Sequence, residues 1–342
     1  KNVKNVKSRF FQEVIYRELE REREREMGLL GRVSAIVALT SVLVMFVPSY
    51  LLQKRFPVPS GEGNAVLITG SSTGIGRHAA VYLAERGFVV YAGVRKESDE
   101  KSLNELKLKN LRPIRIDVTS TSSILEAKRI IESESQNLVG LVNNAGINKE
   151  LPIEVQRLEN MRKVFDVNVF GLVEVTQAFL PMLKQHAGSR IINIGSVAGS
   201  IAVPMKGTYA ASKHALEALS DAMRMELSRF DVSVSLIKPA YVRSKIAEKQ
   251  VGANAVFRQQ LSREEYEMYR HIFDTFELKR MQSELKADSP LVTSEAIWHA
   301  LTNEYPKTRY IVANVNGIPA QLVVPLLSIL PDRLIDMILG HR

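Results

Sequence analysis

Tyr209 and Lys213 form a pair that could carry out proton transfer. The run Tyr209-Ala210-Ala211-Ser212-Lys213 places a phenol and an ammonium four residues apart, on one face of a predicted helix. A tyrosine with its ordinary pKa near 10 is a poor acid or base at neutral pH. A neighbouring lysine cation stabilises the phenolate and lowers that pKa, as proton exchange with a carbonyl oxygen requires. The spacing is common in helices, so the pair needs support from its surroundings.

Other polar residues are predicted to reach the same place. Ser196 follows the predicted strand 191–195, and Asn143-Asn144-Ala145-Gly146 ends another. The carboxyl ends of parallel strands share one edge, where open α/β sheets bind ligands. Asn168 lies in an otherwise apolar stretch, where its amide either belongs to the site or satisfies buried backbone groups.

A glycine-rich turn predicts a dinucleotide site. Strand 65–68 leads directly into Thr69-Gly70-Ser71-Ser72-Thr73-Gly74-Ile75-Gly76, which a helix-forming segment follows. Glycines allow the tight turn and let backbone amides approach a pyrophosphate at the helix N-terminus. The predicted cofactor contacts in this turn are Gly70, Ser72, Thr73, Gly74, Ile75 and Gly76.

The end of the second predicted strand bears on the choice of cofactor. An acidic residue there selects NAD, whereas a nearby arginine accommodates the 2′-phosphate of NADP. Here Val94 stands where the acid is expected, and Arg95 and Lys96 follow it. NADP(H) is therefore favoured, and NAD(H) stays possible. The alternative is that both basic residues are ordinary surface charges.

These segments belong to a repeating strand–helix pattern. Helix-length amphipathic stretches such as 124–133 and 215–230 separate short apolar runs. Such alternation predicts a parallel sheet covered by helices on both faces. The apolar runs are 65–68, 88–92, 138–142, 191–194, 232–237 and 310–312.

In combination, these motifs resemble the short-chain dehydrogenase/reductase family over about residues 64–342. The resemblance implies a Rossmann-type, doubly wound, seven-stranded parallel sheet and hydride transfer between a nicotinamide and a carbonyl or alcohol carbon. It implies that Tyr209 is the general acid/base and that Lys213 lowers its pKa and binds the nicotinamide ribose. Ser196 would hold the substrate oxygen, and Asn168 would keep a water in a proton relay.

The same resemblance implies further cofactor contacts and one departure from the family pattern. Beyond the glycine turn and Arg95, the implied contacts are Asp117, Val118, Asn144, Ala145, Gly146, Pro239 and Val242, besides Tyr209 and Lys213. The family usually has glycine where this chain has Ala240, which adds a methyl group near the nicotinamide. No metal site is predicted.

The N-terminal part has a different composition. Residues 1–28 interleave Glu and Arg and predict a charged helical arm, whose simplest interpretation is a solvated helix. Residues 29–55 predict a single transmembrane helix with its flanks, because 33–52 carries no charge over 20 residues. The dehydrogenase domain is predicted over 60–342, with a substrate lid at about 240–290.

The composition limits the kinds of molecule that the chain is expected to bind. The chain has a net charge of +9 without an aromatic-interleaved basic patch, which argues against nucleic acid. It contains no cysteine, which excludes disulfides and cysteine nucleophiles. The predicted anchor and the apolar residues 201–205 favour a lipophilic substrate and a membrane location. With its anchor and its apolar tail at 319–327 and 334–339, the chain resembles the retinol/hydroxysteroid-dehydrogenase-like branch of the family.

The sequence also leads to expectations about the oligomeric assembly and about the membrane that holds the chain. We expect either a homo-oligomer or a subunit of a larger membrane complex. The competing function is an accessory, structural nucleotide-binding subunit of such a complex, for example a respiratory one. The chain begins at Lys1, as after removal of a targeting sequence, which slightly favours the mitochondrial inner membrane over the endoplasmic reticulum.

Overall fold

The computed structural model describes residues 53–59, 62–134, 137–243 and 261–340. The chain divides into two compact units, residues 1–55 and 56–342, and almost every described residue belongs to the second. The predicted charged arm and the predicted membrane-spanning run 33–52 lie outside the described residues.

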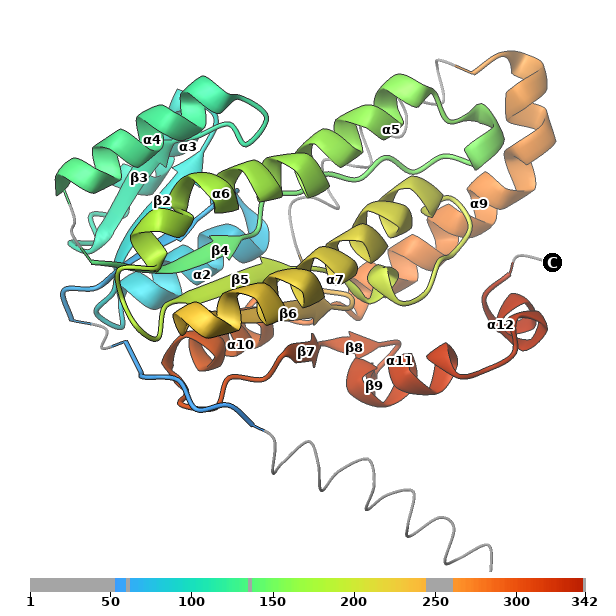
Figure 1. Ribbon diagram of the computed structural model, residues 1–342. Helices are drawn as coiled ribbons and strands as arrows, with labels where there is room; N and C mark the ends of the chain where they lie inside the picture. The colour runs from blue at the N-terminus through green and yellow to red at the C-terminus, as the bar shows by residue number, and fades with distance from the viewer. Residues whose placement is uncertain (1–52, 60–61, 135–136, 244–260, 341–342) are drawn as a thin grey trace, which may run out of the picture. The chain divides into compact units, whose positions relative to one another are not determined.

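Seven parallel strands form one sheet in the order β3-β2-β1-β4-β5-β6-β7 (Figure 1). The sheet order reverses between β1 and β4, and ligands bind in the crevice at such a switch point. The central strands read as continuous apolar runs because both faces of the sheet are covered. The strands are β1 Ala65–Ile68, β2 Val89–Val94, β3 Leu111–Arg115, β4 Leu138–Asn143, β5 Arg190–Ile194, β6 Ser233–Pro239 and β7 Arg309–Val312.

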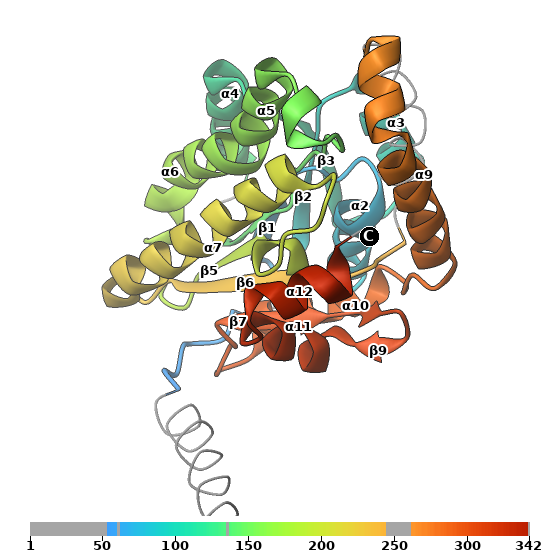
Figure 2. The ribbon, with the colours of Figure 1, turned by 90° about the vertical axis from the view of Figure 1, so that its right-hand side faces the viewer.

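Helices cover both faces of this sheet (Figure 2). One face packs against α2 Gly74–Ala84, α3 Glu97–Asn104 and α10 Leu291–Thr302. The other packs against α4 Thr121–Glu134, α6 Gly171–Leu183 and α7 Gly207–Leu227. This confirms the predicted Rossmann-type, doubly wound, seven-stranded parallel sheet.

One element was missing from the sequence-based prediction, and one predicted helix is confirmed. Strand β3 was not predicted, because Leu111-Arg112-Pro113-Ile114-Arg115 is interrupted by two arginines and a proline. Its arginines are exposed at the end of the sheet, where β3 pairs with β2 alone among the described strands. Helix α7 begins at Gly207 and so contains Tyr209 and Lys213, as predicted, with Tyr209 in its first turn.

A continuous helical segment over 158–183 is made of α5 Leu158–Phe165, a π-helical turn Asp166–Phe170 and α6. Among the described residues, it is the one helix long and apolar enough to cross a membrane. Its apolar side packs on the sheet through Val175, Phe179 and Leu183, so it serves as a core helix. It therefore says nothing about the predicted anchor.

Arg190 is fully buried at the start of β5, where its guanidinium hydrogen-bonds to backbone carbonyl oxygens. The bonded carbonyls belong to Pro57 at 2.9 Å, Ala300 at 3.1 Å, Asn303 at 3.1 Å and Gly188. The ring of Phe56 lies 5.4 Å from the guanidinium carbon. Burial lowers the pKa of Arg190 to about 10, and the carbonyls offset the cost of burying its charge. The segment that enters the domain is thus fastened to β5.

The predicted lid range contains α9, Arg263–Leu285, while 244–260 lies outside the described residues. Ser262 and Glu265 form a capping box at the start of α9. Phe273 and Phe276 of α9 are buried against Leu151 and Met205, which lie in the loops beyond β4 and β5. This small apolar cluster docks α9 over the carboxyl edge of the sheet.

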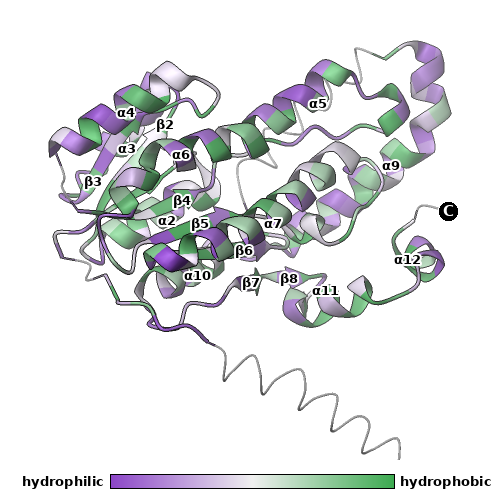
Figure 3. Ribbon diagram, in the orientation of Figure 1, coloured by the Kyte–Doolittle hydropathy of each residue, from purple (hydrophilic) through white to green (hydrophobic). Residues whose placement is uncertain are grey.

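The C-terminal segment continues from β7 through a short hairpin into two helices. These elements are β8 Asn314–Val315, β9 Ile318–Pro319, α11 Ala320–Ser328 and α12 Asp332–Leu339, and Figure 3 shows α11 as largely hydrophobic. Much of their apolar surface is exposed, at Ile318, Leu322, Leu326, Ile329, Leu334, Met337 and Ile338. Short 3₁₀ turns at Ile153–Val155, Val197–Gly199 and Ser228–Phe230 complete the described secondary structure.

Candidate active site

The predicted catalytic residues converge at the carboxyl edge of the sheet. Ser196 lies two residues beyond β5, and Tyr209 and Lys213 lie in the first two turns of α7. Lys213 is buried and donates a 2.8 Å hydrogen bond to the carbonyl of Ile194, the last residue of β5. Its Nζ lies 5.6 Å from the centre of the Tyr209 ring. The structure therefore brings together the hydroxyl, phenol and ammonium that the sequence predicts.

The electrostatics of this group differ from the sequence-based expectation. Burial raises the pKa of Tyr209 to about 12; a hydrogen bond with Ser196 acts to lower this pKa, and the charge of Glu150 acts to raise it. Burial also lowers the pKa of Lys213 to about 8. The prediction that the Tyr209 pKa lies below its usual value was wrong here, because desolvation outweighs the neighbouring groups. Near pH 7 the site holds a protonated phenol, which is ready to donate a proton.

Asn168 occupies the π-helical turn between α5 and α6 and is buried. Its side-chain oxygen accepts a 2.8 Å hydrogen bond from the amide of Ile147. Its side-chain nitrogen donates to the Ile147 carbonyl at 2.9 Å and to the Ser212 hydroxyl at 3.0 Å. The amide thus joins the loop after β4 to α7, as a buried amide with a structural role would. Its predicted water-holding role stays a prediction.

The glycine turn has the backbone shape that its sequence predicts. Gly70 and Gly74 have φ of +70° and +60°, in the left-handed region that favours glycine. A Cβ on Gly76 would lie 2.4 Å from the Gly70 carbonyl oxygen, so only glycine allows this close approach. Ser72, Thr73 and Ile75 are partly exposed in this turn, and Thr73 makes no side-chain capping bond to α2. Backbone amides at the start of α2 are therefore available for a pyrophosphate.

Asn144 ties this turn to the end of β4. The Thr69 hydroxyl accepts hydrogen bonds from the amides of Asn144 and Ala145, both at 3.0 Å. The Asn144 side chain donates to the carbonyls of Thr69 at 2.9 Å and Gly70 at 3.1 Å. Next to this network, a Cβ on Gly146 would lie 3.8 Å from the ammonium of Lys213. The predicted cofactor turn and the predicted catalytic lysine therefore border the same space.

Arg95 and Asp117 lie together at the other end of the predicted cofactor site. Arg95 is exposed just after β2, and Val94 before it is buried. Burial acts to raise the pKa of Asp117, but hydrogen bonds from Thr119 and the charge of Arg95 together lower it below its usual value. Val118 is buried beside the start of α6. The side chain of Val94 offers no acidic contact to a ribose.

The segment after β6 holds the remaining predicted contacts, Pro239 and Val242. Pro239 pairs with Val312 of β7, and Val242 forms a parallel bridge with Asp288. Ala240 donates its amide to the Val312 carbonyl at 3.0 Å, and its φ is not positive. The replacement of the family's glycine by Ala240 therefore needs no strained backbone.

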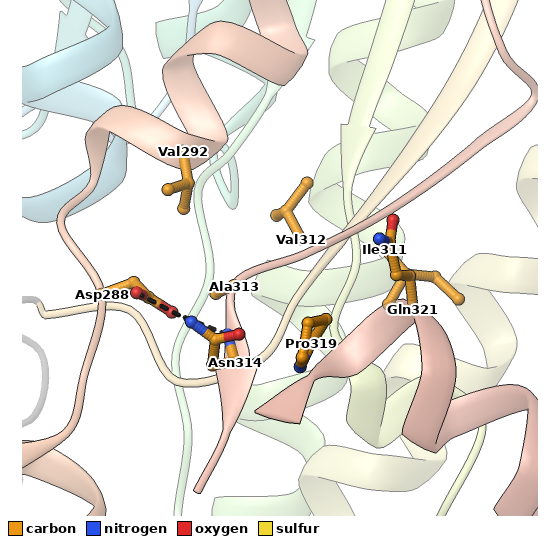
Figure 4. A pocket seen from close by; sticks show the side chains of 8 residues that line it. All are labelled: Asp288, Val292, Ile311, Val312, Ala313, Asn314, Pro319 and Gln321. Atoms are coloured by element: carbon orange, nitrogen blue, oxygen red, sulfur yellow. Dashed lines mark hydrogen bonds between the residues drawn. The ribbon is translucent and has the colours of Figure 1, made fainter. Parts of the chain in front are cut away.

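A cavity of about 290 Å³ lies behind this segment, at the end of β7 (Figure 4). In its lining, the Asp288 carboxylate accepts hydrogen bonds from the backbone amide of Asn314 at 2.7 Å and from the Asn314 side chain at 3.2 Å. Tyr209 and Ser196 do not line this cavity. We therefore assign it a structural role, in which Asp288 joins the lid segment to the β8–β9 hairpin.

Sequence reasoning missed Glu150 and Lys206. Glu150 is buried in the loop after β4, and its carboxylate accepts a 2.9 Å hydrogen bond from Asn148. The Lys206 ammonium lies 3.7 Å from this carboxylate and 5.6 Å from the ring centre of Phe276 on α9. Lys206 directly precedes the catalytic helix and so contacts both the site and the lid. The two residues are 56 positions apart in the sequence (206 − 150), and no local pattern pairs them.

Comparison with known proteins defines the class. Residues 64–254 match the family model described as short chain dehydrogenase, and this chain belongs to that family. It is an oxidoreductase that acts on alcohol or carbonyl groups. It is 34% identical to the uncharacterized oxidoreductase YbbO of Escherichia coli K12 over 80% of this chain and 93% of that protein.

Two mammalian relatives match the branch that the sequence predicts. Retinol dehydrogenase 16 of Rattus norvegicus is 33% identical over 88% of this chain and 94% of that protein. Rat 17-beta-hydroxysteroid dehydrogenase type 6 is 35% identical over 80% of this chain and 87% of that protein. The resemblance to the retinol/hydroxysteroid-dehydrogenase-like branch is thus confirmed.

Solved structures agree on the fold. A short chain dehydrogenase from Burkholderia cenocepacia in complex with NADP has a TM-score of 0.62 and 24% identity, over 83% of this chain and all of that one. A short chain dehydrogenase/reductase from Burkholderia phymatum in complex with NAD has a TM-score of 0.66 and 21% identity, over 83% of this chain and 98% of that one.

Proposed function

We propose that this chain is a membrane-attached, NADP(H)-preferring oxidoreductase of lipophilic alcohols and carbonyls, with Tyr209 as its acid/base. The observation that carries the proposal is the convergence of Ser196, Tyr209 and Lys213 beside the glycine turn at one sheet edge. The cofactor is a nicotinamide dinucleotide, and the close approach at Gly76 leaves the backbone space that a pyrophosphate needs.

The chain's own residues supply positioning and proton transfer. When bound, the nicotinamide supplies or accepts the hydride at its C4. In carbonyl reduction, the Tyr209 hydroxyl donates its proton to the substrate oxygen while the Ser196 hydroxyl hydrogen-bonds to that oxygen. The Lys213 ammonium, 5.6 Å from the Tyr209 ring centre, stabilises the phenolate that results. Alcohol oxidation uses the same groups with the proton moving in the opposite direction.

The primary test is oxidation of NADPH with a panel of carbonyl compounds. We expect turnover with a retinoid aldehyde, a 17-ketosteroid or a long-chain aldehyde. We also expect Tyr209→Phe to lower kcat by about 10²–10⁴-fold with unchanged thermal stability. Equal turnover of small polar ketones would contradict the lipophilic preference. Turnover by neither protein, together with stable incorporation into a larger membrane assembly, would favour the accessory function.

The preference for NADP(H) rests on Arg95. It is exposed beside the buried Val94 and near Asp117, where an adenosine 2′-phosphate would need a cation. Arg95→Ala should raise the KM for NADPH about tenfold, which corresponds to roughly 1.4 kcal/mol, and leave the KM for NADH unchanged. Lys107→Ala, at a lysine that follows α3, is the control. Equal effects of Arg95→Ala on the two cofactors would contradict the assignment.

Membrane attachment is supported by the uncharged run 33–52 and by the exposed apolar side chains of α11 and α12. The full chain should resist carbonate extraction from membranes. Val42→Lys with Val44→Lys should release it, because each charge costs about 2.5–3.5 kcal/mol at the centre of a span. Release of the unmodified chain by carbonate would contradict attachment through a span.

A further inference from the structure

A buried lysine at the end of β6 is not used by the chemistry described above. Lys238 is buried, and its ammonium donates a hydrogen bond to the hydroxyl of Ser200. The same ammonium forms an ion pair with the carboxylate of Glu217 on α7. A buried ammonium costs several kcal/mol unless it is paired, so a lysine here needs a role that a hydrophobic residue could not fill.

Both partners of Lys238 lie next to catalytic groups. Ser200 directly follows the 3₁₀ turn Val197–Gly199, and Ser196 is the N-cap residue of this turn. Glu217 lies one helical turn after Lys213 on α7. Lys238 therefore connects the loop that carries the Ser196 hydroxyl to the helix that carries Tyr209 and Lys213.

Gly199 shows how closely that loop lies on the helix. A Cβ on Gly199 would be 2.9 Å from the carbonyl oxygen of Lys213 and 3.0 Å from the Glu217 carboxylate. The loop backbone therefore rests directly on the turn of α7 that bears Lys213. Any shift of Ser200 must move Ser196 relative to that turn, because the amides of Ala198 and Gly199 bond back to Ser196 at 3.1 Å and 2.9 Å.

Charges on neighbouring elements hold Glu217 in place. The Arg309 side chain on β7 lies 3.4 Å from one Glu217 oxygen and 2.5 Å from Asp221. Asp221 in turn contacts Arg224 at 3.0 Å. A network of side chains with alternating charge therefore runs from the buried Lys238 to the surface. Its members, in order, are Lys238, Glu217, Arg309, Asp221 and Arg224. This network fixes the carboxylate that Lys238 needs.

We propose that Lys238 is a positioning residue that, through Ser200 and Glu217, fixes the Ser196 hydroxyl at its working distance from Tyr209. The role in turnover rests on the proposed function, because Ser196 acts there on the substrate oxygen. The role of Lys238 in ordering the loop that carries Ser196 does not rest on the proposed function. A displacement of about 1 Å at a reacting group can cost up to about 10²-fold in rate, so a modest shift of this loop is measurable.

The test compares Lys238→Met, Ser200→Ala and their double variant. Ser200→Ala keeps the buried Lys238–Glu217 pair, so it should fold even if Lys238→Met proves unstable. The matched control is Ser235→Ala, which removes the 2.8 Å hydrogen bond that the buried Ser235, on the same strand as Lys238, donates to the Lys307 carbonyl. This control should leave turnover unchanged, because Ser235 faces away from the loop's contacts.

The first measurement is amide hydrogen exchange of peptides covering residues 195–201, which needs no substrate. Both single variants should exchange at least roughly tenfold faster there, and Ser235→Ala should match the unmodified protein. Unchanged exchange in both variants would overturn the proposal whether or not the chain is an active dehydrogenase.

The second measurement is steady-state turnover with the carbonyl compound that the panel identifies. Each single variant should lower kcat roughly tenfold with the KM for NADPH within about twofold, and the double variant should be no slower than Lys238→Met. Additive losses, or losses that follow thermal stability across all variants including Ser235→Ala, would overturn a positioning role. If no compound is turned over, the proposed function fails while the exchange result still decides the positioning of the loop.

Discussion

The two halves of the site are held in different ways. The cofactor half, at the ends of β1 and β4, is joined by neutral hydrogen bonds that Thr69 and Asn144 make with backbone groups. The substrate half, around α7 and α9, is joined by the ion pairs Lys206–Glu150 and Lys238–Glu217 and by an aromatic cluster.

Buried polar atoms without a hydrogen-bond partner are more numerous on the substrate side. Among the described residues they include atoms of Gln156, Asn160 and Thr208, whereas at the end of β4, in the cofactor half, the Asn143 Oδ1 is such an atom. Buried polar groups are nearly always paired, so such atoms mark a region that is not optimised for rigidity. We infer that the cofactor half is rigid, because it binds one cofactor, and that the substrate half can adapt its shape to the substrate. Four experiments test this difference between the two halves.

Gly76→Ala should have the largest effect and should act on the cofactor half alone. The added Cβ would lie 2.4 Å from the Gly70 carbonyl oxygen, so the turn must open. The expected loss in kcat/KM for NADPH is about 10³-fold, or roughly 4 kcal/mol. Gly63→Ala is the control, because nothing lies within 4 Å of the Cβ position of Gly63; its φ of +74° adds a backbone strain that Gly76, whose φ is not positive, does not have. Similar losses in both would mean that the close approach at Gly76 is not responsible.

Phe273→Ala should damage the substrate half alone. Phe273 is fully buried between α9 and the loops below it, and truncation of a buried phenylalanine costs about 3–5 kcal/mol. We expect a loss of unfolding free energy near 3 kcal/mol, because α9 lies at the edge of the fold. The KM for a lipophilic carbonyl should rise, and the Kd for NADPH should stay unchanged. Met268→Ala, at an exposed site on the same helix, is the control. A comparable loss of NADPH affinity would show that the halves are not independent.

Thr69→Val should weaken the cofactor half without a steric change. Two amides, those of Asn144 and Ala145, lose their acceptor, and the expected loss in unfolding free energy is about 2 kcal/mol. Chemical denaturation measures it, with Thr302→Val as control because that hydroxyl bonds only within its own helix, to Trp298. A loss of under about 0.5 kcal/mol would indicate that the turn is held by its backbone shape alone.

The pH dependence should show the smallest effect and tests the electrostatics of the substrate half. Carbonyl reduction should decline as pH rises through about 8, where Lys213 loses its charge and can no longer stabilise the phenolate. Alcohol oxidation needs the Tyr209 phenolate, whose pKa the charge of Glu150 helps to raise. Glu150→Gln should therefore shift the oxidation profile to lower pH. Glu154→Gln, at a carboxylate that contacts Tyr269 on α9, is the control; a shift in both variants would point to lid movement.

The same contrast explains what the sequence could predict. The cofactor half is encoded locally, so the turn at residues 69–76 and the strand before it were predicted from neighbouring residues. The roles of Glu150 and Lys238 were not predicted. Glu150 pairs with Lys206 and Lys238 pairs with Glu217, and in each pair only the folded chain brings the two residues together. The sign of the Tyr209 pKa shift was also out of reach, since it depends on desolvation by the whole fold.

Arg190 gives the fold a mechanical property. Its guanidinium joins Pro57, in the segment that enters the domain, to β5. A pull on Pro57 would therefore reach β5, an interior strand that pairs with both β4 and β6, rather than an edge strand of the sheet. The strand that leads to Ser196 is held by hydrogen bonds on both of its sides, so tension on that segment must break bonds to two strands before β5 is displaced.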